Sequence, residues 1–216
     1  MSNVGKKSQL TKQRILKAAI LEFALMGYMH VSTNKIAEMA GVSKGVVFHY
    51  FGNKKKLYMS CFESAYNTFS DYLVGNPKIL NLTDLFERMY YIGTLKQEFY
   101  LQNEALSALI FEASKLPDRD EYKDIKDMAL AYTQKLYELF LNNINMDDFK
   151  PIYRNYETLN FIISVLFHYF KGVEKRYGDN IAYAISDYDN ILAESKKLMD
   201  LLKYGVYVEN KGPEIT

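Results

Sequence analysis

Residues 41–57 read Gly-Val-Ser-Lys-Gly-Val-Val-Phe-His-Tyr-Phe-Gly-Asn-Lys-Lys-Lys-Leu, and this stretch decides the fold of the N-terminal part of the chain. Gly41 can adopt the left-handed conformation that ends a preceding helix. Ser43 can cap the next helix by accepting a hydrogen bond from a backbone N–H two or three residues on. The pattern therefore predicts a turn, a short helix that ends at Gly52, and the start of another helix.

The short helix has two distinct sides. Val47 and Phe51 lie four residues apart, so they share one face and are expected to be buried. The other side would face outward and comprises Lys44, Gly45, Val46, His49 and Tyr50. A short helix with a basic, aromatic and glycine-containing outer face suits insertion into the major groove of DNA.

The preceding residues supply two more helices. The segment from Gln9 to Met26 has apolar residues at helical spacing, and Gly27 is expected to end that helix. Ser32 is expected to cap a second helix whose apolar side contains Ile36 and Ala37. Together the three predicted helices form a helix-turn-helix head.

The head resembles the TetR family of bacterial transcriptional regulators. The resemblance covers about fifty residues and is carried by Ile15, Ala18, Ala19, Phe23, Gly27-Tyr28, Ile36-Ala37, Gly41-Val42-Ser43-Lys44-Gly45, Tyr50-Phe51, Lys54 and Leu57. It implies a DNA-binding head on a helical body with an internal ligand cavity. It also implies dimerisation through the last two long helices and a role as a repressor.

Three positions depart from the family pattern. Phe48 stands where the family often has a tyrosine whose hydroxyl bonds to a phosphate, and Phe48 cannot make that bond. Asn34 stands where arginine is frequent, and Lys35 where an acidic residue often completes a capping box. A lysine at the positive end of a helix costs about 0.3–1 kcal/mol, although the same charge favours a nearby phosphate. The departures leave the operator sequence open.

The predicted DNA contacts fall into two groups. On the short helix, Lys44 is the long donor best placed to reach a guanine edge, with Gly45, Val46, His49 and Tyr50 beside it. The free N–H groups and positive dipole at the start of a helix favour an anion. Phosphate contacts are therefore expected from Thr33, Ser43 and Lys54, which lie at or near helix starts, and the Tyr50 hydroxyl can join them. Asn34 and Lys35, at the start of the second helix, are further candidate DNA contacts.

Charge is distributed unevenly along the chain. The net charge of 216 residues is +1, but residues 1–58 contain ten Lys or Arg and only two acidic residues, Glu22 and Glu38. The head is thus +8 and the remainder −7. A basic head on an acidic body is typical of a protein whose head meets nucleic acid. We expect a DNA-binding domain over residues 1–57 and a ligand-binding and dimerisation domain over residues 58–216.

Composition narrows the class of protein. Hydrophobic residues make up 49% and charged residues 25%, as in soluble globular proteins. No stretch approaches the ~18–20 apolar residues of a membrane span, and the polar N-terminus lacks a signal-peptide core. We therefore expect a cytoplasmic location and no membrane partner. The single cysteine, Cys61, cannot form an intrachain disulfide and is expected to be buried.

The body reads as helical throughout, which makes the predicted fold class all-α. Breaks fall at proline and glycine residues. The expected helices span residues 53–74, 83–99 with Thr83 as cap, 103–115, 120–142, 155–177 and 182–204. The last two carry apolar residues on more than one side, which favours a homodimer seam over burial within one monomer. Leu198, Leu202 and Phe170 are the candidate seam residues.

Aromatic residues suggest a ligand pocket. The chain has 19 Tyr and 13 Phe, and all but six of them follow residue 58. Apolar rings with hydroxyl tips can line a pocket for a flat or lipophilic molecule, although core packing is the alternative for each ring. The candidate ligand contacts are Tyr90, Tyr91, Phe99, Tyr100, Phe111, Tyr137, Phe140, Phe167 and His168.

Enzyme chemistry finds no support in the sequence. His30, His49 and His168 are far apart and show no metal-ligand spacing. The acidic run 118–127 lacks the glycine and glutamate of a calcium loop. We therefore expect no enzyme and no cofactor. The leading prediction is a dimeric repressor that binds a palindromic double-stranded operator and is released by a small lipophilic or aromatic effector. The alternative is an architectural DNA-binding protein without a ligand.

Overall fold

The computed structural model describes residues 3–177 and 181–208, and within them the fold is all-α, as predicted. Phe149 and Tyr207 form one isolated antiparallel β-bridge, which belongs to no strand. The chain forms two compact units, the first made of Met1–Asp71 and Gln102–Gln134 and the second of Tyr72–Leu101 and Lys135–Thr216. In the described residues the elements are α1 (Asn3–His30), α2 (Thr33–Met39), α3 (Lys44–Phe51), α4 (Lys54–Val74), α5 (Pro77–Asn81), α6 (Leu85–Gln102), α7 (Glu104–Lys115), η1 (Asp120–Tyr122), α8 (Lys123–Leu141), η2 (Met146–Asp148), η3 (Pro151–Tyr153), α9 (Tyr156–Tyr177), α10 (Ile181–Ser186) and α11 (Tyr188–Val206).

The first unit is organised around α1. Its apolar stripe buries Ile15, Ala19 and Phe23 completely, and α1 packs against both α2 and α7. Regular helix geometry breaks at Gly27, where φ is 68° and ψ is 164°, and one further turn continues to His30. The predicted helix end at Gly27 is therefore a kink inside α1 rather than its last residue.

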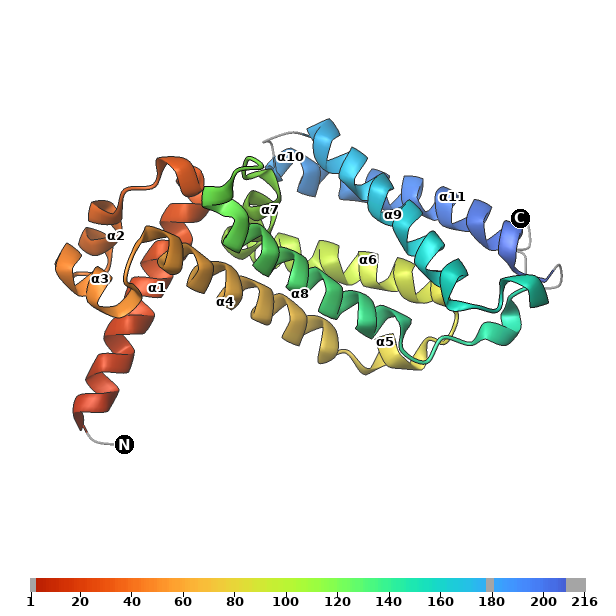
Figure 1. Ribbon diagram of the computed structural model, residues 1–216, viewed down its shortest axis with the longest axis horizontal. Helices are drawn as coiled ribbons and strands as arrows, with labels where there is room; N and C mark the ends of the chain where they lie inside the picture. Colours follow the sequence, from red (N-terminus) through yellow and green to blue (C-terminus); the bar gives the residue numbers. More distant parts are fainter. Residues whose placement is uncertain (1–2, 178–180, 209–216) are drawn as a thin grey trace. The chain divides into compact units, whose positions relative to one another are not determined.

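The helix-turn-helix follows the sequence prediction closely (Figure 1). Gly41 has a φ of 63° and forms the turn after α2. Ser43 Oγ accepts a hydrogen bond from the N–H of Val46 at 3.4 Å and so caps α3. Val47 and Phe51 are buried, which confirms the predicted inner face of α3. Ser32 occupies the N-cap position of α2 but its side chain makes no capping hydrogen bond there.

The helices of the second unit begin and end close to the predicted residues, with three differences, of which the first two concern α6 and α5. Asp84, rather than Thr83, caps α6, because its carboxylate accepts the N–H groups of Phe86 at 2.9 Å and Glu87 at 3.0 Å. An additional short helix, α5, begins at Pro77, and the Asn76 side chain caps it by accepting the N–H of Lys78.

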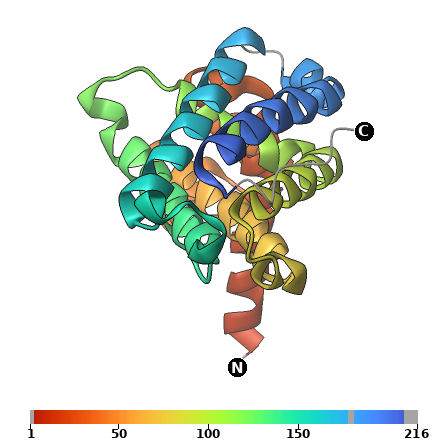
Figure 2. The same ribbon diagram turned by 90° about the vertical axis from the view of Figure 1, so that its right-hand side faces the viewer.

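The predicted helix 182–204 is in fact two helices, α10 and α11, with Asp187 between them. The Asp187 carboxylate accepts a hydrogen bond from the Tyr177 hydroxyl and another from the Asn190 amide at 2.5 Å. These side-chain bonds favour a break over a continuous helix, because a short acidic side chain competes locally with helical hydrogen bonding. The C-terminal helix α11 packs along α9 (Figure 1 and Figure 2).

One end of the second unit holds a dense core. Leu85 and Phe86 of α6 pack there with Phe149, and the wider cluster contains Leu159, Ile162, Leu166, Met199 and Tyr207. Beside it Lys203 Nζ and Asp84 Oδ2 form an ion pair of 2.8 Å between largely buried side chains. Arg88 is completely buried and donates from Nε to Leu82 O at 2.7 Å and from Nη1 to the carbonyls of Phe140 and Asn142. It thereby satisfies the carbonyls at the end of α8.

Candidate DNA-binding interface

The outer face of α3 presents the residues that the sequence predicted. Lys44, Gly45 and His49 are exposed, while Val46 and Tyr50 are half-buried. With Val47 and Phe51 fixed inside, all five lie on the side of α3 that is available to a ligand. A ligand-facing helix of this length and polarity has the form of a major-groove reader.

Contacts within the head set the positions of these side chains. The Tyr50 hydroxyl lies 3.0 Å from Ser8 Oγ, which ties α3 to the N-terminal part of α1. His49 packs edge-on against the Tyr50 ring, with 5.3 Å between the ring centroids. Lys44 Nζ lies 5.8 Å from the centroid of the Phe48 ring. Phe48, which cannot bond to a phosphate, thus supports the lysine expected to read a base.

The start of α2 carries the second predicted group. Thr33 is half-buried, and Asn34 and Lys35 are exposed. Lys35 Nζ donates to both carboxylate oxygens of Glu38 at 3.1 Å. An exposed pair of this kind contributes about 0.2–1 kcal/mol, so Lys35 can exchange Glu38 for a phosphate at little cost.

Lys54 is engaged inside the head. Its Nζ donates to Met29 O at 3.3 Å and lies 5.2 Å from the centroid of the Tyr28 ring. Partial burial lowers the pKa of Lys54 below its ordinary value. The side chain therefore holds the last turn of α1, and its predicted contact with a phosphate stays a prediction.

Two basic residues near the interface are absent from the sequence-based set. Lys12 Nζ lies 5.7 Å from the centroid of the Phe51 ring. Arg14 is exposed, and its Nη1 would lie 3.9 Å from a Cβ placed on Gly41, so the guanidinium neighbours the turn of the helix-turn-helix. The excess of basic residues before position 58 was the only sequence signal for either residue, because their proximity to α3 depends on the packing of α1.

The candidate ligand contacts of the second unit form two aromatic groups. In one, Phe99 lies against Tyr72 and Tyr100, and Tyr100 against Tyr188, with centroid distances between 5.6 and 6.3 Å. In the other, the ring of Tyr137 lies 6.3 Å from those of Phe140 and Phe167. Phe99, Tyr100 and Phe140 are buried.

The remaining candidates are more dispersed. Tyr91 exchanges hydrogen bonds with the Asn76 side chain at 3.0 and 3.2 Å, and Tyr90 is exposed. His168 is exposed on α9, with Nδ1 2.7 Å from Ser164 O. Phe111 belongs to the first unit and is half-buried. The His168 ring also lies 5.9 Å from the Phe167 ring of the second group. The structure therefore groups six of the nine candidates by ring contacts and leaves their role in ligand binding a prediction.

The described residues were also compared with the requirements of a metal site, a membrane span and a reactive thiol. No group of three or more His, Cys, Asp or Glu side chains there could hold a metal ion. Among those same residues, no helix combines the length and the apolar character needed to cross a membrane. Cys61 is completely buried, as predicted, and burial raises the pKa of its thiol. A thiol in that state is inert.

Residues 15–61 match the family model described as bacterial regulatory proteins, tetR family. The HTH-type transcriptional repressor AcnR of Corynebacterium efficiens is 38% identical over 56 residues, which are 26% of this chain and 30% of that repressor. The HTH-type transcriptional regulator YvkB of Bacillus subtilis is 25% identical over 165 residues, covering 74% of this chain and 81% of YvkB.

Solved structures share the fold along most of the chain. The regulator FadR of Bacillus subtilis, in complex with stearoyl-CoA, aligns with a TM-score of 0.64 and 18% identity over 90% of this chain and 99% of its own. NalD of Pseudomonas aeruginosa, a secondary repressor of a multidrug efflux pump, aligns with a TM-score of 0.62 and 19% identity over 92% and 98% of the two chains. With the helix-turn-helix geometry, the match over residues 15–61 shows that the head of the chain is the DNA-binding domain of the TetR family of bacterial transcriptional regulators.

Proposed function

We propose that the protein is a dimeric, ligand-responsive transcriptional repressor that binds a palindromic operator. The observation that carries the proposal is the outer face of α3, where Lys44, Gly45 and His49 are exposed over a buried Val47 and Phe51. The two-fold symmetry of a dimer would present two such faces to half-sites about one helical turn apart. The names of similar proteins, AcnR among them, support repression.

Exposed apolar residues on α9 and α11 support the dimer. Phe161 on α9 is 63% exposed, and Leu201 and Tyr204 on α11 are 69% and 47% exposed. Large apolar side chains gathered on two packed helices mark an interaction surface. We assign this surface, defined by Phe161, Leu201 and Tyr204, to the second copy of the chain and call it the seam.

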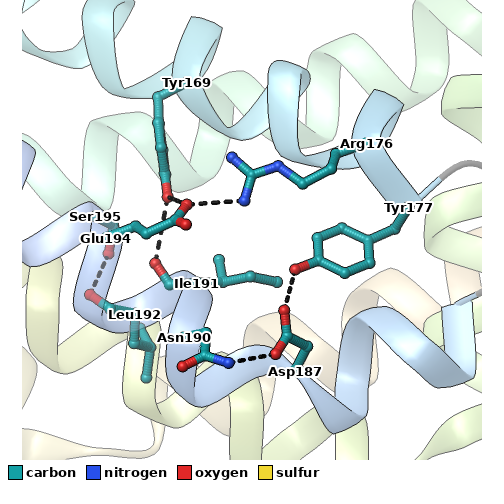
Figure 3. A network of polar contacts seen from close by, with 9 residues as sticks. All are labelled: Tyr169, Arg176, Tyr177, Asp187, Asn190, Ile191, Leu192, Glu194 and Ser195. Carbon is teal, nitrogen blue, oxygen red and sulfur yellow. Dashed lines mark hydrogen bonds and ion pairs between the residues drawn. The ribbon is translucent and has the colours of Figure 1, made fainter.

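A polar network fixes the two seam helices against each other (Figure 3). Arg176 Nη1 of α9 lies 2.9 Å from Glu194 Oε2 of α11, and the Tyr169 hydroxyl donates to the same oxygen at 3.1 Å. The Tyr177 hydroxyl donates to the carboxylate of Asp187, the residue just before α11. These bonds fix the packing of α11 on α9, which supports the proposal that seam residues from both helices meet the partner together.

The two aromatic groups of the second unit support an organic effector. The first group (Tyr72, Phe99, Tyr100 and Tyr188) and the second (Tyr137, Phe140 and Phe167) offer apolar faces with hydroxyl edges. Such surroundings suit a lipophilic or aromatic molecule held by burial and a few hydrogen bonds. FadR, which shares this fold, was solved with stearoyl-CoA. An effector that prefers a state with low DNA affinity would release the operator.

Selection from random double-stranded DNA tests the proposal. We expect the purified protein to enrich a palindrome and to bind it as a dimer. A screen of lipophilic compounds by thermal shift should then yield a compound that raises the melting temperature and lowers operator affinity, since a ligand that stabilises the released state must oppose DNA. Enrichment of no particular sequence, together with no stabilising compound, would favour the architectural DNA-binding alternative.

A further inference from the structure

The last turn of α1 is built on an unusual backbone conformation. Gly27, with φ of 68° and ψ of 164°, occupies a region that only glycine adopts readily. The kink interrupts the hydrogen-bond ladder of α1, and two residues after the turn the chain enters α2. The geometry at Gly27 thus sets where the helix-turn-helix begins.

A carboxylate from α7 occupies the space beside this kink. Glu112 Oε1 accepts a hydrogen bond from the N–H of Tyr28 at 3.3 Å. A Cβ placed on Gly27 would lie 2.7 Å from the same oxygen and 3.3 Å from the carboxyl carbon. The glycine therefore provides both the backbone conformation and the room that the carboxylate needs.

Three aromatic rings and two further contacts hold the same turn. The Tyr28 ring packs edge-on against Tyr58 of α4 at 5.0 Å and against Tyr122 of η1 at 5.7 Å, and it stacks on Phe23 at 6.2 Å. Lys54 Nζ donates to Met29 O, and the Tyr122 hydroxyl lies 2.8 Å from Met29 Sδ. Burial, and then the nearby charge of Glu112, raises the pKa of Tyr58.

Among the contacts that fix the last turn of α1, the one from Glu112 differs in the helix that supplies it. The contacts from Tyr58 and Lys54 come from α4, which follows the helix-turn-helix directly in the chain. Glu112 comes from α7, which a single residue, Asn103, separates from α6 of the second unit. It is a hydrogen bond to the backbone of α1 from a helix that is remote in sequence, so its presence depends on where α7 lies.

We propose that Glu112 is a positioning residue for DNA recognition, which sets the placement of α2 and α3 by accepting the Tyr28 N–H beside Gly27. The inference rests on the proposed DNA-binding function. Glu112 itself touches no base or phosphate in this scheme; it acts through the last turn of α1. Movement of α7 would release or restore the hydrogen bond and so change how the head meets its operator.

Two features of the contact predict which substitutions preserve it. Glutamine keeps the side-chain length and an oxygen acceptor, so Glu112→Gln retains the hydrogen bond. Aspartate keeps the charge but shortens the side chain by one methylene, so Glu112→Asp loses it. The positioning role therefore predicts that Gln resembles wild type and that Asp resembles Ala, whereas a role for charge alone predicts the reverse.

The test compares an operator selected from random DNA with an unrelated duplex of equal length. We expect Glu112→Ala and Glu112→Asp to weaken operator binding roughly tenfold, and to change binding of the unrelated duplex less than about twofold, because phosphate contacts tolerate a displaced head better than base contacts do. Glu112→Gln should stay within about threefold of wild type on both. Glu104→Ala, which removes an exposed acidic residue from the same helix, is the matched control.

A spectroscopic measurement separates positioning from loss of stability. Cys61 is buried, so a Met39→Cys variant offers one accessible thiol on each head for a spin label. We expect the distance distribution between the two labels of a dimer to broaden or shift in Glu112→Ala and Glu112→Asp, and to match the parent in Glu112→Gln. If Glu112→Ala does not fold, the Asp and Gln variants carry both measurements.

The outcomes are distinct. Operator affinity and label distances that are the same in every Glu112 variant would overturn the positioning role and leave the proposed function intact. Equal losses on operator and unrelated DNA, with a lower melting temperature and unchanged distances, would also overturn it. A wild-type protein that selects no operator would instead overturn the proposed function.

Discussion

Leu198 and Leu201 lie three residues apart on α11 but belong to different environments. Leu198 packs against the buried cluster that contains Leu85 and Phe149, whereas Leu201 is exposed. Leu202 packs against the same cluster. Leu198 and Leu202, the two leucines that the sequence suggested for the seam, therefore pack against the core of the monomer. The seam that we propose uses Leu201 instead.

Replacing Leu201 with Glu should prevent dimerisation without unfolding the protein. A charge at the centre of an apolar interface cannot be desolvated cheaply, whereas the same side chain is solvated in the monomer. Sedimentation should give a monomer with a nearly unchanged melting temperature and little operator affinity. Leu198→Glu should instead lower the free energy of unfolding by about 1–3 kcal/mol.

Leu130→Glu is the control for Leu201→Glu, because Leu130 of α8 is also an exposed leucine, 57% exposed. This variant should stay dimeric. A Leu201→Glu protein that sediments as a dimer and binds the operator normally would remove α11 from the seam.

Replacing Lys44 with Ala should weaken operator binding more than binding to random DNA. A good contact to a guanine edge contributes about 1–3 kcal/mol of discrimination, while a phosphate contact contributes none. Titration of labelled duplexes measures both affinities. Lys35→Ala is the comparison, since we assign Lys35 to a phosphate. Equal losses on the two duplexes would reassign Lys44 to a phosphate as well.

Replacing Lys54 with Ala should lower affinity on all DNA sequences. If its ammonium moves from Met29 O to a phosphate, the magnitude of the slope of log affinity against log salt should fall by about one. Binding measured between low and moderate salt gives the slope. An unchanged slope with a lower melting temperature would show that Lys54 only holds the last turn of α1 through Met29 and Tyr28.

The network between α9 and α11 should weaken in acid. Arg176, and then Tyr169, donate to Glu194 and lower the pKa of its carboxyl. A carboxylate whose pKa is lowered on folding stabilises the protein above its unfolded pKa of about 4.3, and this contribution is lost as pH falls through the lower folded pKa.

Melting temperatures of wild type and Glu194→Gln from pH 3 to pH 7 test this. Wild type should be the more stable protein above about pH 5, and the difference should shrink as pH falls below about 4. Glu157→Gln, at an exposed position on α9, serves as the control. A difference that grows in acid would contradict the role assigned to Glu194.

Replacing Arg88 with Ala should destabilise the second unit strongly. Arg88 is completely buried, and three main-chain carbonyls accept its hydrogen bonds. Its removal leaves buried carbonyls and a cavity, so urea denaturation should show a loss of about 3–5 kcal/mol. Arg88→Lys should restore only part of it, because one ammonium group cannot reproduce the planar fork. A loss below about 1 kcal/mol would mean that water replaces the guanidinium.

Local chemistry allowed much of the fold to be predicted. Gly41 and Gly52 have the positive φ values that their turn positions indicated, and Ser43 caps α3. Val47 and Phe51 are buried because a spacing of four residues places them on one side of any helix. The residue that caps α6 was predicted wrongly. Asp84 caps it instead of Thr83, because Asp and Thr are both common N-cap residues and the two stand next to each other in the sequence.

The sequence by itself determined which residues form helices, where most of them end, and which face of α3 turns outward, because these depend on neighbours within about four positions along the chain. Only the tertiary structure decided that Leu198 is covered and Leu201 exposed, that Lys54 holds Met29, and that Glu112 meets Tyr28. The last of these contacts joins residues 84 positions apart. Such contacts depend on how helices pack, and helical periodicity carries no information about which helix a face will meet.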